Sequence, residues 1–128
     1  MHNQRMKKQK TILIVEDDLF LAKAYEQAFE KLECTITTLY EGGEAFATAK
    51  KLQPAVILLD ILLPVLDGFE VLKQLKNDPS TRDIPVIIAS NLGQESEIET
   101  GKELGANNYI VKSDTSITEI GELLKAFL

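Results

Sequence analysis

Polar side chains that could together bind a cation and a phosphoryl group follow four short apolar runs of this chain. Glu16, Asp17 and Asp18 follow the first run, while Asp60, Ser90 and Lys112 stand at the ends of the other three. If the runs are parallel strands of one sheet, these groups meet at its carboxyl edge, where open α/β sheets bind ligands. Carboxylates, a hydroxyl and an ammonium on one edge could hold a divalent cation beside a phosphoryl group.

Each of these side chains also has a purely structural explanation. An aspartate at a strand end, such as Asp60, can simply cap a turn, and a lysine such as Lys112 is commonly a solvated surface residue. By position, Asp18 is the cap of a following helix, which leaves Glu16 and Asp17 at the rim of the sheet. Carboxylates held this close repel one another, so the cluster favours a bound cation, and a few hard oxygen ligands favour Mg²⁺.

Short apolar runs alternate along the chain with segments of helical period. We predict strands at Thr11–Val15, Thr35–Leu39, Ala55–Leu59, Pro85–Ala89 and Asn108–Val111. The third run, AVILL, is apolar throughout, as expected of a strand that is covered on both faces. Strands that alternate with helices through short connections predict an α/β fold, a doubly wound five-stranded parallel sheet.

The segments between the strands carry apolar residues at helical spacing. We predict a first helix after Asp18 with Leu21, Ala24, Tyr25, Ala28 and Leu32 on one face, a second over Gly42–Leu52, and a third with Phe69, Leu72 and Leu75 after a loop marked by Pro64 and Gly68. The fourth helix, about Glu95–Leu104, is weakly patterned, so we expect it to be the least stable and to end at Gly105. The last helix should run from about Ser116 to Phe127.

The composition predicts one folded domain with an acidic surface. The chain has 128 residues, of which 45% are apolar and 27% charged, and its net charge of -6 argues against unaided nucleic-acid binding. The single cysteine, Cys34, cannot form an internal disulfide and suits a reducing compartment, so we expect a cytoplasmic protein. Apolar runs are too short for a membrane span. We predict a basic, disordered tail at residues 1–10 and a domain at 11–128.

Together these motifs strongly resemble the receiver domain of two-component response regulators, over nearly the whole chain from Thr11 to Phe127. The segment ILIVEDD is similar to the family's first strand and acidic pair, and VILLDILLPVLDGFEVL to its phosphoacceptor strand and the following loop. IPVIIAS is similar to the fourth strand, which ends in a hydroxyl residue, and GANNYIVK to the fifth, which ends in a lysine. The resemblance, closest to stand-alone chemotaxis regulators, implies a flavodoxin-like (βα)5 fold with strand order 2-1-3-4-5.

The resemblance also implies a phosphoacceptor and a metal site. Asp60 would accept a phosphoryl group from the phosphohistidine of a sensor histidine kinase or a histidine phosphotransfer protein. Asp17, Asp60 and the backbone carbonyl of Leu62 would hold Mg²⁺, with Glu16 acting directly or through a water. This assignment agrees with the chemistry, because phosphoryl transfer depends on positioning and charge neutralisation more than on covalent help.

Three further residues receive roles from the same resemblance. Lys112 and the hydroxyl of Ser90 would bind phosphoryl oxygens. Tyr109 would be the switch aromatic, whose ring turns inward as Ser90 shifts, although a strand tyrosine can also be a half-exposed residue with no such role. Phosphorylation would then change the binding surface formed by the last two helices and the fifth strand.

Four positions depart from the family pattern. Glu16 replaces the commoner Asp, Ser90 replaces the commoner Thr, and Ser113 replaces the usual Pro. Asn91 stands where the family usually has a small residue, so its side chain could narrow access to the phosphoryl site. A cis bond costs about 0.5–1 kcal/mol before proline but roughly 2.5–4 kcal/mol before other residues. We therefore predict that the Lys112–Ser113 peptide is trans and that the loop at residues 113–115 adjusts instead.

The implied function is that of a stand-alone signalling switch with no output domain in the chain, and not of an enzyme beyond its own phosphorylation and slow dephosphorylation. We expect a monomer or weak dimer that binds an unknown target protein, without direct DNA or membrane binding. One alternative is an aspartyl-phosphate hydrolase, but Leu62 stands where such enzymes usually carry a second Asp. A flavin module would need a phosphate loop after the first strand, and a module that is never phosphorylated would not need the complete set of site residues.

Overall fold

A computed structural model describes residues 10–128 of the chain, and within them it contains one parallel sheet of five strands. The strands are β1 (Thr11–Val15), β2 (Thr35–Leu39), β3 (Val56–Leu59), β4 (Val86–Ser90) and β5 (Asn108–Val111), in the order β2-β1-β3-β4-β5. The predicted fold class and strand order are confirmed. The predicted basic tail lies outside the described residues apart from Lys10, which is exposed.

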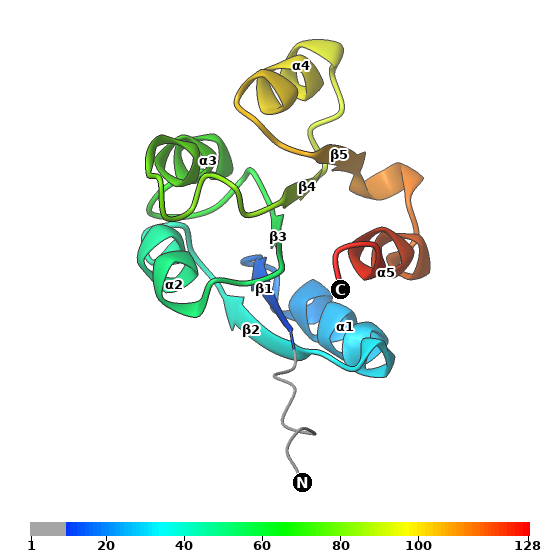
Figure 1. Cartoon of the computed structure of the whole chain (residues 1–128). Coiled ribbons are helices and arrows are strands. Elements are labelled where there is room, and N and C mark those ends of the chain that lie inside the picture. Colours follow the sequence, from blue (N-terminus) through cyan, green and yellow to red (C-terminus); the bar gives the residue numbers. More distant parts are fainter. Residues whose placement is uncertain (1–9) are drawn as a thin grey trace, which may run out of the picture.

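Helices cover both faces of the sheet (Figure 1). They are α1 (Leu19–Phe29), α2 (Ala45–Leu52), α3 (Gly68–Asn77), α4 (Glu95–Glu103) and α5 (Ile117–Lys125), with short 3-10 turns η2 (Glu30–Leu32) and η3 (Lys112–Asp114). Helices α1 and α5 lie together on one face, and α2, α3 and α4 lie on the other. Within the part of the chain that the structure describes, none of the helices has the length and apolar character needed to cross a membrane.

Local sequence explains where several helices begin and end. Asp18 caps α1 as predicted, because its Oδ1 accepts hydrogen bonds from the amides of Phe20 and Leu21 at 3.0 and 3.2 Å. Gly105 follows α4 with a φ of 107°, a backbone conformation that glycine adopts most readily. These two ends could be read from the sequence because the capping interaction is local.

The second helix begins later than predicted, at Ala45 instead of Gly42. The amide of Gly42 donates to the carbonyl of Pro64 at 3.2 Å, so this residue lies against the loop after β3, and a turn precedes the helix. A Cβ at Gly42 would lie 1.8 Å from the Leu66 carbonyl oxygen, which explains why glycine is required at this close approach. The first helix is also shorter than predicted, since Leu32 belongs to η2.

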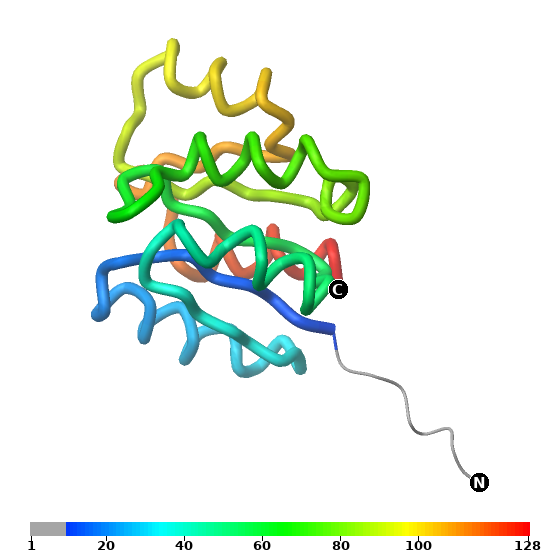
Figure 2. Tube along the Cα trace, turned by 90° about the vertical axis from the view of Figure 1, so that its left-hand side faces the viewer, coloured from blue at the N-terminus to red at the C-terminus, as the bar shows by residue number. Residues whose placement is uncertain are grey.

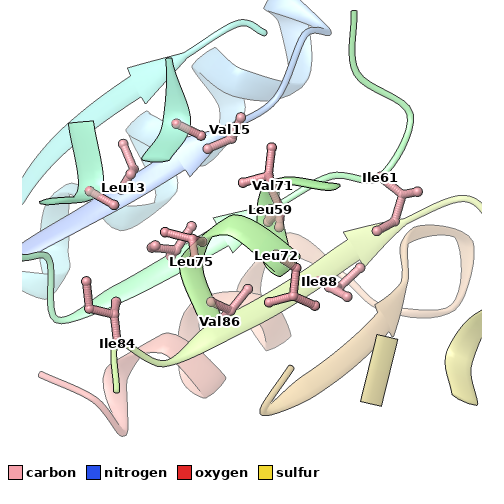
Figure 3. Packing of buried hydrophobic residues seen from close by; sticks show 13 residues of the cluster. Leu13, Val15, Leu59, Ile61, Val71, Leu72, Leu75, Ile84, Val86 and Ile88 are labelled. Carbon is pink, nitrogen blue, oxygen red and sulfur yellow. The ribbon is translucent and has the colours of Figure 1, made fainter. Parts of the chain in front are cut away.

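Two apolar clusters hold the helices against the sheet. One cluster, shown in Figure 3, packs side chains of β1, β3 and β4, among them Leu13, Leu59 and Ile88, against residues of α2 and α3 such as Leu72. The other cluster fills the opposite face, beneath α1 and α5, and contains Ile14, Leu58 and Ile110 together with Tyr25 and Phe29 of α1. Burying both faces of the sheet is what makes its central strands apolar throughout.

The register of the strands aligns their carboxyl ends at one edge. Val15 pairs with Leu59 across β1 and β3, and Ser90 pairs with Val111 across β4 and β5. Figure 2 shows the helices lying alongside the strands, with the C-terminus near the opposite edge, where β1 begins. The residues that follow Val15, Leu59 and Val111 therefore emerge close together.

Candidate active site

Glu16, Asp60 and Lys112 form a buried network at the carboxyl edge of the sheet. The Lys112 ammonium lies 2.7 Å from Oε1 of Glu16 and 3.1 Å from Oδ2 of Asp60. Glu16 is 2% exposed and Asp60 is 6% exposed, so the two carboxylates are almost fully removed from water. Placing these charges in a poorly hydrated site is tolerable because the lysine pairs with both acids.

Strand periodicity explains why these three residues meet. Successive side chains of a strand point to opposite faces, so Glu16 continues the row of Ile14, and Asp60 continues the row of Leu58. Lys112 follows Ile110 in the same way. Since Ile14, Leu58 and Ile110 belong to the cluster beneath α1 and α5, the three charged groups form the outermost layer of that face.

Burial and mutual attraction set the charge state of the network. Burial raises the pKa of Glu16 above its ordinary value, although the hydrogen bond from Lys112 opposes that effect. Burial by itself would lower the pKa of Lys112, but the hydrogen bond to Glu16 and the charge of Asp60 raise it overall. Lys112 is therefore a permanent cation at neutral pH and holds the carboxylates together.

Asp60 is fixed in orientation by its own backbone. Its Oδ1 accepts a hydrogen bond from the amide of Ile61 at 2.7 Å, while Oδ2 faces Lys112. Each of the two carboxylate oxygens thus accepts a hydrogen bond, which fixes the orientation of Asp60 beside Lys112.

The acidic side chains fit a divalent cation. Carboxylate oxygens of Glu16, Asp17 and Asp60 all lie within 4.8 Å of one another. Asp17 is exposed while the other two are buried, so an ion could keep several waters on its outer side, as Mg²⁺ prefers. Among residues 10–128, no hydrogen bond is donated to the carbonyl oxygen of Leu62, which leaves this group available as a ligand.

Ser90 and Tyr109 are linked through the backbone of Leu92. Ser90 is fully buried, and its Oγ accepts a hydrogen bond from the Leu92 amide at 3.2 Å. The Tyr109 hydroxyl donates to the Leu92 carbonyl at 2.6 Å. A movement of the loop after β4 would therefore change the hydrogen bonds of both side chains.

The comparison with protein families decides what this arrangement is. Residues 12–125 match the response regulator receiver domain family, which covers both acidic segments, Ser90 and Lys112. The chain belongs to this family. Receiver domains accept a phosphoryl group on an aspartate and bind Mg²⁺ in the acidic cleft beside it.

Other receiver-containing proteins show the same relationship. The chain is 35% identical to the chemotaxis protein CheV2 of Helicobacter pylori over 129 residues, which cover 98% of this chain and 41% of CheV2. It spans only 39% to 43% of the length of the first curated relatives that it matches.

Solved structures agree with the fold and with the family. The phosphorylated cyanobacterial phytochrome response regulator RcpA superposes with a TM-score of 0.77 at 31% identity, covering 92% of this chain and 90% of that one. The receiver domain of the sensor histidine kinase PA1611 from Pseudomonas aeruginosa superposes with a TM-score of 0.82 at 26% identity, covering 94% and 98%. That neighbour holds a magnesium ion in its active-site cleft.

The departure from the receiver pattern after Lys112 is accommodated by the backbone. Every peptide bond between residues 10 and 128 is trans, so the predicted trans bond between Lys112 and Ser113 is confirmed. The following residues form η3, in which the amide of Thr115 bonds the Lys112 carbonyl at 3.5 Å. Lys112 thus reaches both carboxylates while the peptide that follows it is trans.

Two residues of this receiver domain were given no role at the site by the sequence. The sequence predicts Gly68 only as a loop residue before the third helix, yet a Cβ there would lie 2.1 Å from the carbonyl oxygen of Asp60. The sequence predicts Tyr25 only as part of the apolar face of the first helix, yet its hydroxyl is buried without a partner. The polar atom on a core tyrosine was the one signal that could have drawn attention to it.

Proposed function

We propose that this receiver domain is a phosphorylation-controlled switch with Asp60 as its phosphoacceptor. The observation that carries the proposal is the position of Asp60, which shares Lys112 with Glu16 at an edge that holds a cluster of three acids. The Asp60 carboxylate is held in one orientation, with acids beside it that can bind a cation and with Lys112, which can neutralise phosphoryl oxygens. That is the set of interactions that phosphoryl transfer requires.

The reaction moves a phosphoryl group from a phosphohistidine to Asp60. A carboxylate oxygen of Asp60 attacks phosphorus, the phosphorus–nitrogen bond breaks, and its electron pair stays on the imidazole of the donor. Asp17, Asp60 and the Leu62 carbonyl would hold Mg²⁺, with Glu16 acting directly or through a water. The ion, when bound, neutralises charge on the phosphoryl oxygens. The donor is a sensor histidine kinase or a histidine phosphotransfer protein.

The response to phosphorylation follows from the buried ammonium and the loop after β4. Lys112 turns from the free carboxylates toward the new phosphoryl oxygens, which carry more charge. The Ser90 hydroxyl donates to the same phosphoryl group. This moves the loop after β4, because the Leu92 backbone is hydrogen-bonded to both Ser90 and Tyr109. The surface formed by α4, β5 and α5 then changes its conformation and binds a target protein. We propose that the domain acts as a monomer or weak dimer in the cytoplasm and that it turns over no other substrate.

Phosphorylation by a small donor tests the proposal. With acetyl phosphate and Mg²⁺, we expect one added phosphoryl group by intact-mass measurement. Without Mg²⁺ the reaction should slow by about a hundred-fold or more, because the ion supplies several kcal/mol of charge stabilisation. Equal rates with Mg²⁺ and with a chelator would contradict the metal assignment, and no adduct under any condition would contradict the phosphoacceptor.

The lifetime of the phosphorylated state should depend on Leu62. This side chain is 58% exposed next to Asp60, and being apolar it cannot orient an attacking water by hydrogen bonding. We expect slow loss of the phosphoryl group, over much longer than seconds, and a several-fold faster loss in Leu62→Asn, of the size that one polar contact to a water can supply. Leu92 should shield the phosphoryl group from water less than Leu62 does, because its side chain packs partly against the core.

A matched control separates this effect from a general change in polarity. Leu52→Asn alters another exposed leucine, 37% accessible, at the end of α2. It should leave the lifetime unchanged. A wild-type lifetime of seconds, or equal effects of the two variants, would show that Leu62 does not protect the phosphoryl group.

Direct DNA binding should be weak. The chain has a net charge of -6, and phosphate contacts need a basic face to release counterions. In a gel shift at low salt, we expect no complex at nanomolar protein with or without phosphorylation. A sequence-specific complex at such concentrations would contradict the acidic surface as the deciding factor.

A further inference from the structure

The hydroxyl of Tyr25 lies in the core with no hydrogen-bond partner. Tyr25 is 1% exposed, and its Oη is the sole buried side-chain polar atom in residues 10–128 that lacks a partner. A buried hydroxyl without a partner destabilises the folded state, and such groups in folded proteins usually have a specific explanation. The ring alone would be supplied equally well by phenylalanine, so the hydroxyl needs a reason of its own.

The geometry of α1 directs this hydroxyl toward the active site. Long side chains of a helix lean toward its N-terminus, and α1 begins just after Asp17 and Asp18, at the carboxyl edge of the sheet. The ring stacks on Phe29, with centroids 5.5 Å apart and planes at 13°, which fixes its position on the side away from the site. The hydroxyl therefore points from the core toward the layer of charged groups.

The layer above Tyr25 is the buried network itself. The tyrosine packs in one cluster with Ile14, Leu58 and Ile110, and the next side chains on the same face of those strands are Glu16, Asp60 and Lys112. The electrostatics agree with this placement: burial raises the pKa of Tyr25, and the charges of Glu16 and Asp60 raise it further. The hydroxyl thus keeps its proton and can act as a donor to a carboxylate.

Glu16 is the carboxylate that will need such a donor. In the structure its Oε1 is bonded to Lys112 at 2.7 Å and its Oε2 accepts the Asp18 amide at 3.1 Å. When Lys112 turns to a phosphoryl group on Asp60, Oε1 of a nearly fully buried glutamate loses its donor. Even with Mg²⁺ held by the neighbouring acids, this buried oxygen then lacks a hydrogen-bond donor, which is costly for a charged group.

We propose that the Tyr25 hydroxyl is a positioning group of the active site, which donates to Glu16, directly or through one buried water, when Lys112 leaves it. In the resting state the Tyr25 hydroxyl has no hydrogen-bond partner, and in the phosphorylated state it donates a hydrogen bond to Glu16. It lowers the free energy of the state in which Lys112 is committed to the phosphoryl group. This inference rests on the proposed function for its setting, but its first test does not require phosphorylation.

The first test removes Lys112 and asks whether the hydroxyl then matters. Urea unfolding is measured for wild type, Tyr25→Phe, Lys112→Met and the double variant. In the wild-type background Tyr25→Phe should leave the midpoint unchanged or raise it, since the hydroxyl has no partner. In the Lys112→Met background it should lower the midpoint, because Glu16 has lost the lysine. Equal shifts in both backgrounds, or a smaller loss without Lys112, would overturn the proposal.

The second test uses beryllofluoride, a stable mimic of the phosphoryl group, and decides the matter if Lys112→Met does not fold. Its affinity in the presence of Mg²⁺ is measured by calorimetry. Tyr25→Phe should weaken binding by about ten-fold, the value of one hydrogen bond to a charged acceptor. Tyr40→Phe, which removes the hydroxyl of an exposed tyrosine, should not weaken it.

The outcomes also separate this inference from the proposed function. Equal beryllofluoride affinities for wild type and Tyr25→Phe would overturn the role of Tyr25 while leaving Asp60 as the phosphoacceptor. If the wild type binds no beryllofluoride and takes up no phosphoryl group, the proposed function fails, and the unfolding measurements still judge whether Tyr25 supports Glu16.

Discussion

Asp60→Asn takes up no phosphoryl group from acetyl phosphate and Mg²⁺ and keeps its fold: this is the result we expect with the largest effect on function. The amide has nearly the shape of the carboxylate, and its oxygen can still accept the Ile61 hydrogen bond that orients Asp60. It carries no charge, however, so it is a poor nucleophile and a poor ligand for a cation. Glu16 keeps its ion pair with Lys112, which preserves half of the network.

Intact-mass measurement shows the loss, and urea unfolding shows that the variant is folded. Stability should change little, since Lys112 loses one partner while Glu16 loses the repulsion of a second buried carboxylate. Asp67→Asn is the matched control. It changes an exposed aspartate that caps α3, where asparagine caps equally well, so phosphorylation should persist. An unchanged adduct in Asp60→Asn would remove Asp60 as the phosphoacceptor.

Gly68→Ala should produce a large loss of stability. A Cβ at this position would lie 2.1 Å from the Asp60 carbonyl oxygen and 2.7 Å from Cα of Ile61. Both are backbone atoms, so no side chain can move aside, and the loop after β3 must shift. We expect a loss of roughly 3 kcal/mol, at the upper end for overpacked cores and a large fraction of a domain's stability.

A second helical glycine provides the control for Gly68→Ala. At Gly121 in α5 the added Cβ would meet only the edge of the Phe29 ring, at 3.4 Å, which is an ordinary contact. Gly121→Ala should therefore be neutral or gain about 0.5–1 kcal/mol from reduced backbone entropy. Both values follow from urea midpoints. Similar effects of the two substitutions would show that the approach of α3 to Asp60 is less tight than the structure indicates.

Much of the fold could be read from local pattern. Thr11–Val15 and Thr35–Leu39 are strands with the predicted bounds, because a run of apolar or β-branched residues between polar segments has few other solutions. Asp18 was predicted as a cap for a similarly local reason. The start of α2 was predicted three residues too early, at Gly42, which instead contacts the loop after β3, more than twenty positions away, a contact that no local pattern indicates.

The sequence by itself determined that Asp17, Asp60, Ser90 and Lys112 stand at or just beyond strand ends, and that a parallel sheet would bring them to one edge. Periodicity and turn residues were enough for this, because both act over a few neighbouring positions. Only the tertiary structure decided how these groups pair. Whether Lys112 bonds Glu16, Asp60 or both depends on strand register and burial, which arise from packing across the whole sheet.

The same reason separates Tyr25 and Gly68 from the predicted site. Along the chain Tyr25 is one more member of an apolar helix face, and Gly68 is one more loop residue. Only the packing of α1 beneath Glu16, and of α3 against the backbone of Asp60, gives these residues a relation to the site. Contacts of this kind join residues far apart in sequence, and no local pattern records them.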